Sequence, residues 1–267
     1  MISKFYLQVA VMIETINSFE LLLIKKFKSH PLFFQINTIT WHHFLEILIQ
    51  RRFLSLSIVN IYEFAIDALS DQEIKQTVRG ILNEEYPRNT KGVPLPSHRE
   101  LLFQDLLNLG ATYEMILTTA ETSVTQMVRE ESYKLMVSCL GEEYCQAGLV
   151  AFLRFWAEVL VSIEYSCLWQ RISERLSNGQ SNNKTRSEFY YFHMIHDSRN
   201  SNIGKESFLG GLTHSQELAI HLQKLITSED TLLYCINVEK SAYQLKYRFY
   251  DQFISDCLNL RPSLTQM

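Results

Sequence analysis

Glycine and proline, the two residues that most often interrupt helices, are scarce in this sequence. Only nine glycines and five prolines occur among 267 residues, and no proline lies between Pro96 and Pro262. Sheets with many turns use these residues repeatedly, so their scarcity argues against a β-rich fold. Because 46% of the residues are hydrophobic and 12% are aromatic, the chain can bury a substantial core. We therefore expect an all-α protein.

Other signals are missing as well. The five cysteines form no C-x-x-C pair, which argues against a disulfide framework or a zinc knuckle and favours buried thiols in a reducing compartment. The net charge of −4 gives no electrostatic attraction to nucleic acid or to an anionic membrane. Glu14 and Glu20 interrupt the apolar N-terminal stretch, which is atypical of a signal peptide, and no uninterrupted run reaches the roughly 18 apolar residues that span a bilayer. These absences predict a cytoplasmic protein without nucleic acid or membrane as a partner.

The remaining pattern predicts a single helical domain over residues 1–267. Helix-start signals of the capping-box type, in which a Ser or Thr is followed three residues later by Glu or Gln, begin at Ser70, Ser97, Thr185 and Thr213. No linker divides the chain, and no internal repeat is present. The helices are expected at about 4–27, 38–69 with a break near 55–57, from 70, from 97, 112–138, 142–177, 187–201, from 213 and 228–258, and the main loops at 87–96, 177–184 and 200–212.

Two glutamates continue apolar stripes on predicted helices. Glu85 follows the stripe of the helix that starts at Ser70, with Glu84 on the polar side, and Glu164 lies on the stripe of the helix over 142–177. A carboxylate in such a position is costly to bury unless a cation or a metal neutralises it. Glu158, in contrast, has Arg154 four residues before it, which is the spacing of an ordinary solvated ion pair. Glu164 is therefore the preferred candidate of the two.

Histidines supply further candidate metal ligands beside these glutamates. In the stretch 187–201, His193 and Asp197 lie four residues apart on one helix face, and His196 projects from nearly the same face. His98 opens a helix at the far end of the loop that follows Glu85. Carboxylate oxygens mixed with imidazoles suit iron or manganese in a helix bundle. The alternative interpretation is a polar helix face that happens to carry two histidines.

The segments Leu82–Glu85, His98–Leu102, Leu160–Glu164 and Phe189–Asp197, in this order, resemble the heme-oxygenase-like di-metal oxidases, and among them the CADD-like proteins. The resemblance covers about residues 35 to 225. It implies a compact bundle of seven or more helices, shared with TenA and PqqC, in which two metal ions lie between core helices and support oxygen-dependent redox chemistry on small organic substrates. It implies no heme, and none of the eight histidines has the context of a proximal heme ligand.

Carried over residue by residue, the resemblance implies Glu85, His98, Glu164, His193 and Asp197 as metal ligands, with Glu84 as the alternative to Glu85. The family also has a histidine three or four positions after the aspartate, where this chain has Asn200 and Ser201. His196 or His214 could replace it, and His214 is preferred because the Gly210-Gly211 turn and the cap at Thr213 would fix its position. Without a replacement, the protein would bind one iron ion or none instead of two.

Three functions follow from this interpretation. The leading one is a non-heme iron or manganese oxidase or oxygenase that acts with O2 on a small organic substrate. The second is a metal-free helical binding or interaction protein in which a degenerate site forms a buried hydrogen-bonded network. The third, a TenA-like hydrolase, requires a nucleophilic cysteine, and no base stands beside any cysteine in sequence. The aromatic content is also compatible with a homodimer.

Overall fold

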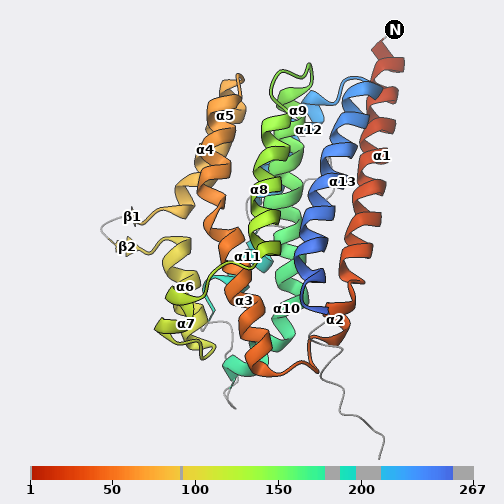
Figure 1. Ribbon diagram of the computed structural model, residues 1–267. Helices are drawn as coiled ribbons and strands as arrows, with labels where there is room; N and C mark the ends of the chain where they lie inside the picture. Colours follow the sequence, from red (N-terminus) through yellow and green to blue (C-terminus); the bar gives the residue numbers. More distant parts are fainter. Residues whose placement is uncertain (1, 91–92, 178–186, 197–211, 255–267) are drawn as a thin grey trace, which may run out of the picture.

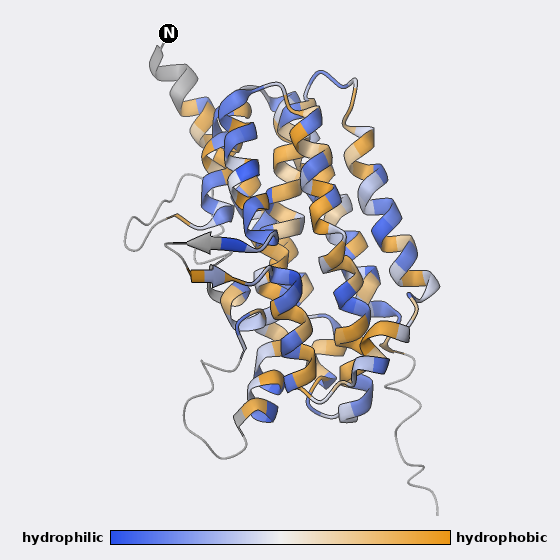
Figure 2. Ribbon diagram, turned by 90° about the vertical axis from the view of Figure 1, so that its left-hand side faces the viewer, coloured by the Kyte–Doolittle hydropathy of each residue, from blue (hydrophilic) through white to orange (hydrophobic). Residues whose placement is uncertain are grey.

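A computed structural model describes residues 2–90, 93–177, 187–196 and 212–254 of the chain. The long helices stand side by side as a bundle, which confirms the prediction of an all-α fold (Figure 1). Polar and hydrophobic residues alternate in stripes along the helices (Figure 2). The helices are α1 (Ile2–Lys28), α2 (Pro31–Gln35), α3 (Trp41–Leu56), α4 (Ile58–Ala68), α5 (Gln72–Leu82), α6 (His98–Asn108), α7 (Tyr113–Thr118), α8 (Ser123–Ser138), α9 (Cys145–Phe152), α10 (Leu160–Ser177), α11 (Tyr190–His196), α12 (His214–Leu225) and α13 (Glu229–Asp251), with a 3-10 turn η1 (Asn83–Glu85) and a π-helical segment η2 (Leu153–Val159).

The helix-start signals had different outcomes. The capping boxes at Ser97 and Thr213 are both formed, with reciprocal hydrogen bonds to Glu100 and Gln216. The prediction at Ser70 is wrong by one residue, because the side chain of Asp71 accepts the hydrogen bonds from the first backbone N–H groups of α5. The fourth signal, at Thr185, lies outside the described residues.

Two predicted segments are divided differently in the structure. The segment 87–96, expected as a plain loop, contains a short antiparallel hairpin of β1 (Arg88–Thr90) and β2 (Val93–Leu95), which projects from the bundle on the side away from α1 (Figure 1). These are the only strands among the residues that the structure describes. The predicted helix 112–138 is two helices, α7 and α8, because Thr122 caps a new start after α7 ends.

The central helix of the bundle is interrupted by the π-helical segment. α9, η2 and α10 follow one another without a gap from Cys145 to Ser177. Every residue of η2 is buried, so this stretch has no solvent-facing side. A π turn also holds more residues than an α turn, so the spacing that assigns residues to helix faces does not carry through it.

Two helical stretches are apolar and long enough, by composition alone, to cross a membrane. The stretch Cys145–Leu176 is 89% buried inside the bundle, as the core helix of a globular domain is, and Leu7–Lys28 is 39% buried. Core helices pass the same compositional test. The absence of a membrane partner stays a prediction.

Candidate metal centre

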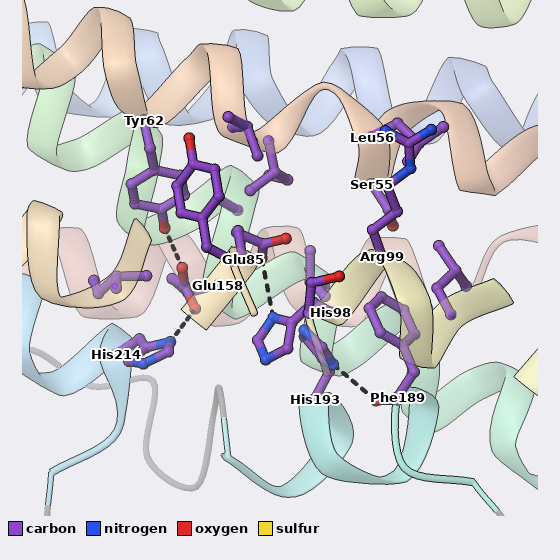
Figure 3. A pocket seen from close by; sticks show the side chains of 18 of the residues that line it. Ser55, Leu56, Tyr62, Glu85, His98, Arg99, Glu158, Phe189, His193 and His214 are labelled. Carbon is purple, nitrogen blue, oxygen red and sulfur yellow. Dashed lines mark hydrogen bonds and ion pairs between the residues drawn. The ribbon is translucent and has the colours of Figure 1, made fainter. Parts of the chain in front are cut away.

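Several helices contribute side chains to a cavity of about 390 Å³. Its walls come from the end of α3, α4, η1, the start of α6, η2, α10, α11 and the start of α12. Figure 3 shows that histidine and glutamate side chains from these elements point toward one another along one side of the cavity. The volume is within the range of protein cavities that bind small organic molecules.

Glu85, His98 and His193 form the first group of potential metal ligands. One ligand atom from each of them lies within 4.8 Å of the other two. Nδ1 of His98 is 3.0 Å from Oε1 of Glu85, and the rings of His98 and His193 are 4.6 Å apart. Since metal–ligand bonds to nitrogen and oxygen are about 2.0–2.2 Å long, one ion can be reached by all three side chains after small adjustments.

Local structure explains why these three residues meet. Glu85 ends the 3-10 turn that closes α5, and His98 is the first residue of α6, directly after the cap at Ser97. The hairpin of β1 and β2 joins the two, so one short excursion of the chain brings Glu85 back to His98. His193 comes from the first turn of α11, which packs along α10.

The tautomer of His193 is fixed by the backbone. Its Nδ1 is 2.7 Å from the carbonyl oxygen of Phe189, which can only accept a hydrogen bond, so Nδ1 donates and Nε2 keeps its lone pair. Burial, together with the charge of His98, holds the pKa of His193 well below its ordinary value. The imidazole is therefore neutral at neutral pH, as a metal ligand must be.

Glu84, Glu158 and His214 form a second group beside the first. Oε2 of Glu84 is 3.6 Å from Nε2 of His214 and 3.9 Å from Nε2 of His98. These distances are too long for hydrogen bonds, and this buried oxygen accepts none. Nδ1 of His214 lies 3.4 Å from Oε2 of Glu158, and the hydroxyl of Tyr62 donates a hydrogen bond to the other oxygen of Glu158.

Electrostatics keep Glu84 ionised in this group. Burial opposes ionisation, but His214 and Arg88 outweigh it and lower the pKa of Glu84 to about 2. Its Oε1 pairs with Nη1 of Arg88 at 3.6 Å, while its buried Oε2 lies between two imidazole nitrogens without a hydrogen bond, an arrangement that a cation would satisfy.

Glu164 does not join either group. It is fully buried, its Oε1 is 2.6 Å from Nε of Arg51, and its Oε2 is 3.0 Å from Nζ of Lys246. The hydroxyl of Tyr250 donates a further hydrogen bond to this carboxylate. The glutamate thus has the cationic partner that its apolar stripe demanded, but the partners are an arginine and a lysine.

The expectation that Glu158 forms a solvated pair is wrong. Glu158 is 4% exposed, and Arg154, also buried, donates to Glu20 instead. The error has a physical cause, because the helix around Glu158 is buried on every side and is π-helical, so the α-helical spacing from Arg154 did not define a solvent face. A sequence signal existed in the apolar residues around Glu158, in the run WAEVL of 156–160.

The other expected residues have mixed outcomes. His214 is brought to the site by the first turn of α12, as its cap at Thr213 suggested. Asp197, Asn200 and Ser201 lie outside the described residues, and so does the side chain of His196. Tyr62, which contacts Glu158, was not foreseen, because nothing in the sequence of α4 distinguishes it from a core tyrosine.

The donor set fits iron or manganese better than zinc. Three carboxylates and three imidazoles converge, with His98 between the two groups, and the described cavity lining contains no cysteine. Hard oxygen ligands mixed with imidazoles are typical of iron and manganese, whereas structural zinc sites use four tight ligands that often include thiolates.

The comparisons with known proteins agree with this fold. The chain has the fold of a CADD-like protein, which confirms at the level of fold the resemblance seen in the sequence. One crystal structure of a CADD-like protein of unknown function from Nostoc punctiforme matches with a TM-score of 0.65 at 11% identity and covers 97% of this chain and 100% of that chain. A second crystal structure with the same description and organism matches with a TM-score of 0.68 at 12% identity, over 94% and 99% of the two chains. No family model and no curated protein matches the sequence.

Proposed function

We propose that the protein is a non-heme iron or manganese oxidase or oxygenase that acts with O2 on a small organic substrate. The observation that supports this proposal most is the buried group of Glu85, His98 and His193 beside the hydrogen-bond-free oxygen of Glu84. Such a group on the wall of a cavity would place a metal ion next to a binding space. The fold alone does not fix a function, so the proposal depends on the site.

In this proposal Glu85, His98 and His193 hold one ion, and Glu84, Glu158 and His214 hold a second ion or complete the first. Asp197 stays a predicted ligand from outside the described residues. The metal, when bound, supplies the binding and activation of dioxygen.

Neighbouring backbone and side-chain groups orient the proposed ligands. The carbonyl of Phe189 orients His193, and the Tyr62 hydroxyl holds a proton against Glu158 and fixes that carboxylate. The apolar lining of the cavity, which includes Ile81 and Val161, limits the access of water.

One observation favours the metal-free alternative in part. The network of Glu164, Arg51, Lys246 and Tyr250 is a buried hydrogen-bonded network of the kind expected for a protein without metal. At the Glu/His groups the only ion pair with an arginine or lysine among the described residues joins Nη1 of Arg88 to Oε1 of Glu84, at 3.6 Å. No observation supports a TenA-like hydrolase, because no cysteine lines the described part of the cavity.

Oxygen consumption tests the proposal. The protein is loaded with Fe(II) and reductant in the absence of air, freed of unbound iron, and mixed with O2 while oxygen and the ferric absorbance are followed. We expect the wild type to oxidise its iron much faster than free Fe(II) in the same buffer, and His193→Ala to lose this reaction. His221→Ala is a matched control, because His221 is as buried as His193 but contacts Thr77 and does not line the cavity. Oxidation at the rate of free Fe(II) in the wild type would refute the proposal.

A further inference from the structure

Polar contacts between α5 and α12 fix how these two helices lie against each other. Nζ of Lys224 donates a hydrogen bond to Oε2 of Glu73 at 3.2 Å, and Nε2 of His221 is 2.9 Å from Oγ1 of Thr77. A step backward along α12 is therefore matched by a step forward along α5. The two helices are antiparallel, and one row of side chains on each faces the other.

The same rows continue to the second group of candidate ligands. Nε2 of His214 approaches Oε2 of Glu84, at 3.6 Å, where η1 continues α5. Between this contact and that of His221, the helical spacing of three or four residues leaves one position in each row, Glu217 on α12 and Gly80 on α5. Glycine has no side chain to offer. Among the described residues, no hydrogen bond or ion pair links the carboxylate of Glu217 to another side chain.

The space beside Gly80 is open. Apart from the backbone of its own helix, no heavy atom lies within 4 Å of the position that a Cβ would take there, and Gly80 is exposed. Side chains on a helix lean toward its N-terminus, so Glu217 leans toward the turn that carries His214. The carboxylate of Glu217 is therefore directed along an open groove toward Glu84.

The charges that act on Glu217 are those of the second group. Burial raises the pKa of Glu217, His214 opposes this shift, and the negative charges of Glu84 and Glu158 add to it. Arg88 pairs with Oε1 of Glu84 at 3.6 Å, which leaves three carboxylates for one arginine and one imidazole. Carboxylates gathered in this way repel one another, and a divalent cation between them would relieve the repulsion.

A glutamate in the first turn of a helix also has a simpler role. Its charge interacts favourably with the positive end of the helix dipole, which by itself explains an acidic residue at this position of α12. The dipole does not explain why Glu217 shares a row with His214 and faces a glycine beside Glu84. Because the dipole role requires no cation, metal binding distinguishes the two interpretations.

We propose that Glu217 is a ligand of the second metal position, together with Glu84 and His214, and that a divalent cation reaches this position through the groove beside Gly80. This inference rests on the proposed function, since it names a further ligand and an entry route for the second of its two ions. Carboxylate oxygens and imidazole nitrogens are ligands that Fe(II) and Mn(II) accept.

Mn(II) binding tests the inference. The full-length protein, freed of metal, is titrated with Mn(II), and electron paramagnetic resonance of the free ion gives the number of ions bound and their dissociation constants. We expect the wild type to bind two ions, and Glu217→Gln to bind the second ion roughly tenfold more weakly or worse while the first is unchanged. Gly80→Lys should have the same effect, because an ammonium group opposite Glu217 would take the place of the cation.

Two controls isolate this effect. Gly80→Ala adds only a methyl group to an open space and should keep both ions, and so should Glu73→Gln, which changes an exposed carboxylate of the same row three turns away. Equal Mn(II) binding by the wild type, Glu217→Gln and Gly80→Lys would overturn the inference, however many ions the wild type holds. A single ion that is lost in Glu217→Gln and Gly80→Lys but kept in His193→Ala would refute the proposed function and leave this position standing.

Discussion

Glu158 and Glu164 lie six residues apart on the central helix, and both are buried, yet their surroundings differ. Glu158 contacts a tyrosine hydroxyl and an imidazole at the cavity, whereas Glu164 neutralises Arg51 and Lys246 in the core. A carboxylate surrounded by neutral donors and imidazoles is available to a metal, and one that already pairs with two cations is not. The two residues can therefore be tested against each other.

The first prediction concerns Glu158. Changing Glu158 to Gln removes one anionic ligand without a change of shape, so the metal content should fall from about two ions toward one, with weaker binding of the remainder. The secondary structure by circular dichroism should be unchanged. Metal analysis after gel filtration measures the effect, and Glu164→Gln is the matched variant. A larger loss of metal in Glu164→Gln than in Glu158→Gln would reverse the assignment.

The second prediction concerns Glu164 and pH. Burial opposes ionisation, but Arg51 and Lys246 lower the pKa of Glu164 to about 2, below its ordinary value of 4.5. A lowered carboxyl pKa stabilises the fold fully above the ordinary value and progressively less as pH falls toward the lowered one. Glu164→Gln should thus cost about 3 kcal/mol of unfolding free energy at pH 7, because it leaves the buried guanidinium of Arg51 without its anion.

Urea denaturation of wild type and Glu164→Gln at pH 7, 5, 4 and 3 measures this cost. The difference between the two proteins should be present at pH 5 and should shrink between pH 4 and 3. A difference that does not change with pH would show that the carboxylate is not ionised in the fold.

Among the elements, helix α6 contacts both the 3-10 turn η1 and the start of α11 through polar side chains. His98 opens α6 and reaches Glu85, and Asp105, two turns later, holds the start of α11. The carboxylate of Asp105 accepts hydrogen bonds from Oγ of Ser187 at 2.7 Å and from the backbone N–H of Phe189 at 3.1 Å and of Tyr190 at 3.3 Å. A carboxylate at a helix N-terminus satisfies its free N–H groups and interacts well with its dipole.

The third prediction follows from this contact. Asp105→Ala removes the acceptor of the first N–H groups of α11, which should cost roughly 1–3 kcal/mol and loosen the turn that carries His193. Hydrogen exchange of 187–196 should accelerate, and metal affinity should fall although Asp105 is not a ligand. Asp105→Asn keeps an acceptor oxygen and should have a smaller effect. Unchanged exchange in Asp105→Ala would contradict this role.

The elements also show what sequence reasoning can reach. The caps at Ser97 and Thr213 were predictable because a capping box is formed within four residues. The hydrogen bonds from the start of α11 to Asp105 join residues more than 80 positions apart. They depend on how α6 packs near α11, which no local sequence pattern encodes. The π-helical segment η2 could not be predicted either, because its sequence is that of an ordinary apolar α-helix. Hence local patterns singled out Glu85, His98, His193 and His214, which the structure brings to one cavity, whereas Glu158 was predicted to be solvated and is buried at the same cavity.

For the whole molecule, the cavity is assembled from segments that are distant in the chain, from Arg51 to His214. The same fold occurs in the Nostoc punctiforme protein at 11–12% identity, so the bundle tolerates nearly complete change of sequence. The histidines and carboxylates at its centre are costly to bury without a ligand. In the function proposed above, these side chains bind metal.

Metal stoichiometry tests this role of the histidines and carboxylates most directly. The full-length protein is loaded with Fe(II) and reductant in the absence of air, separated from free iron and measured by inductively coupled plasma mass spectrometry. We predict that the wild type and His221→Ala hold at least one iron ion per chain, about two if His214 completes the second position, and that His193→Ala holds none. A wild type with no iron above the level of His193→Ala would contradict the claim.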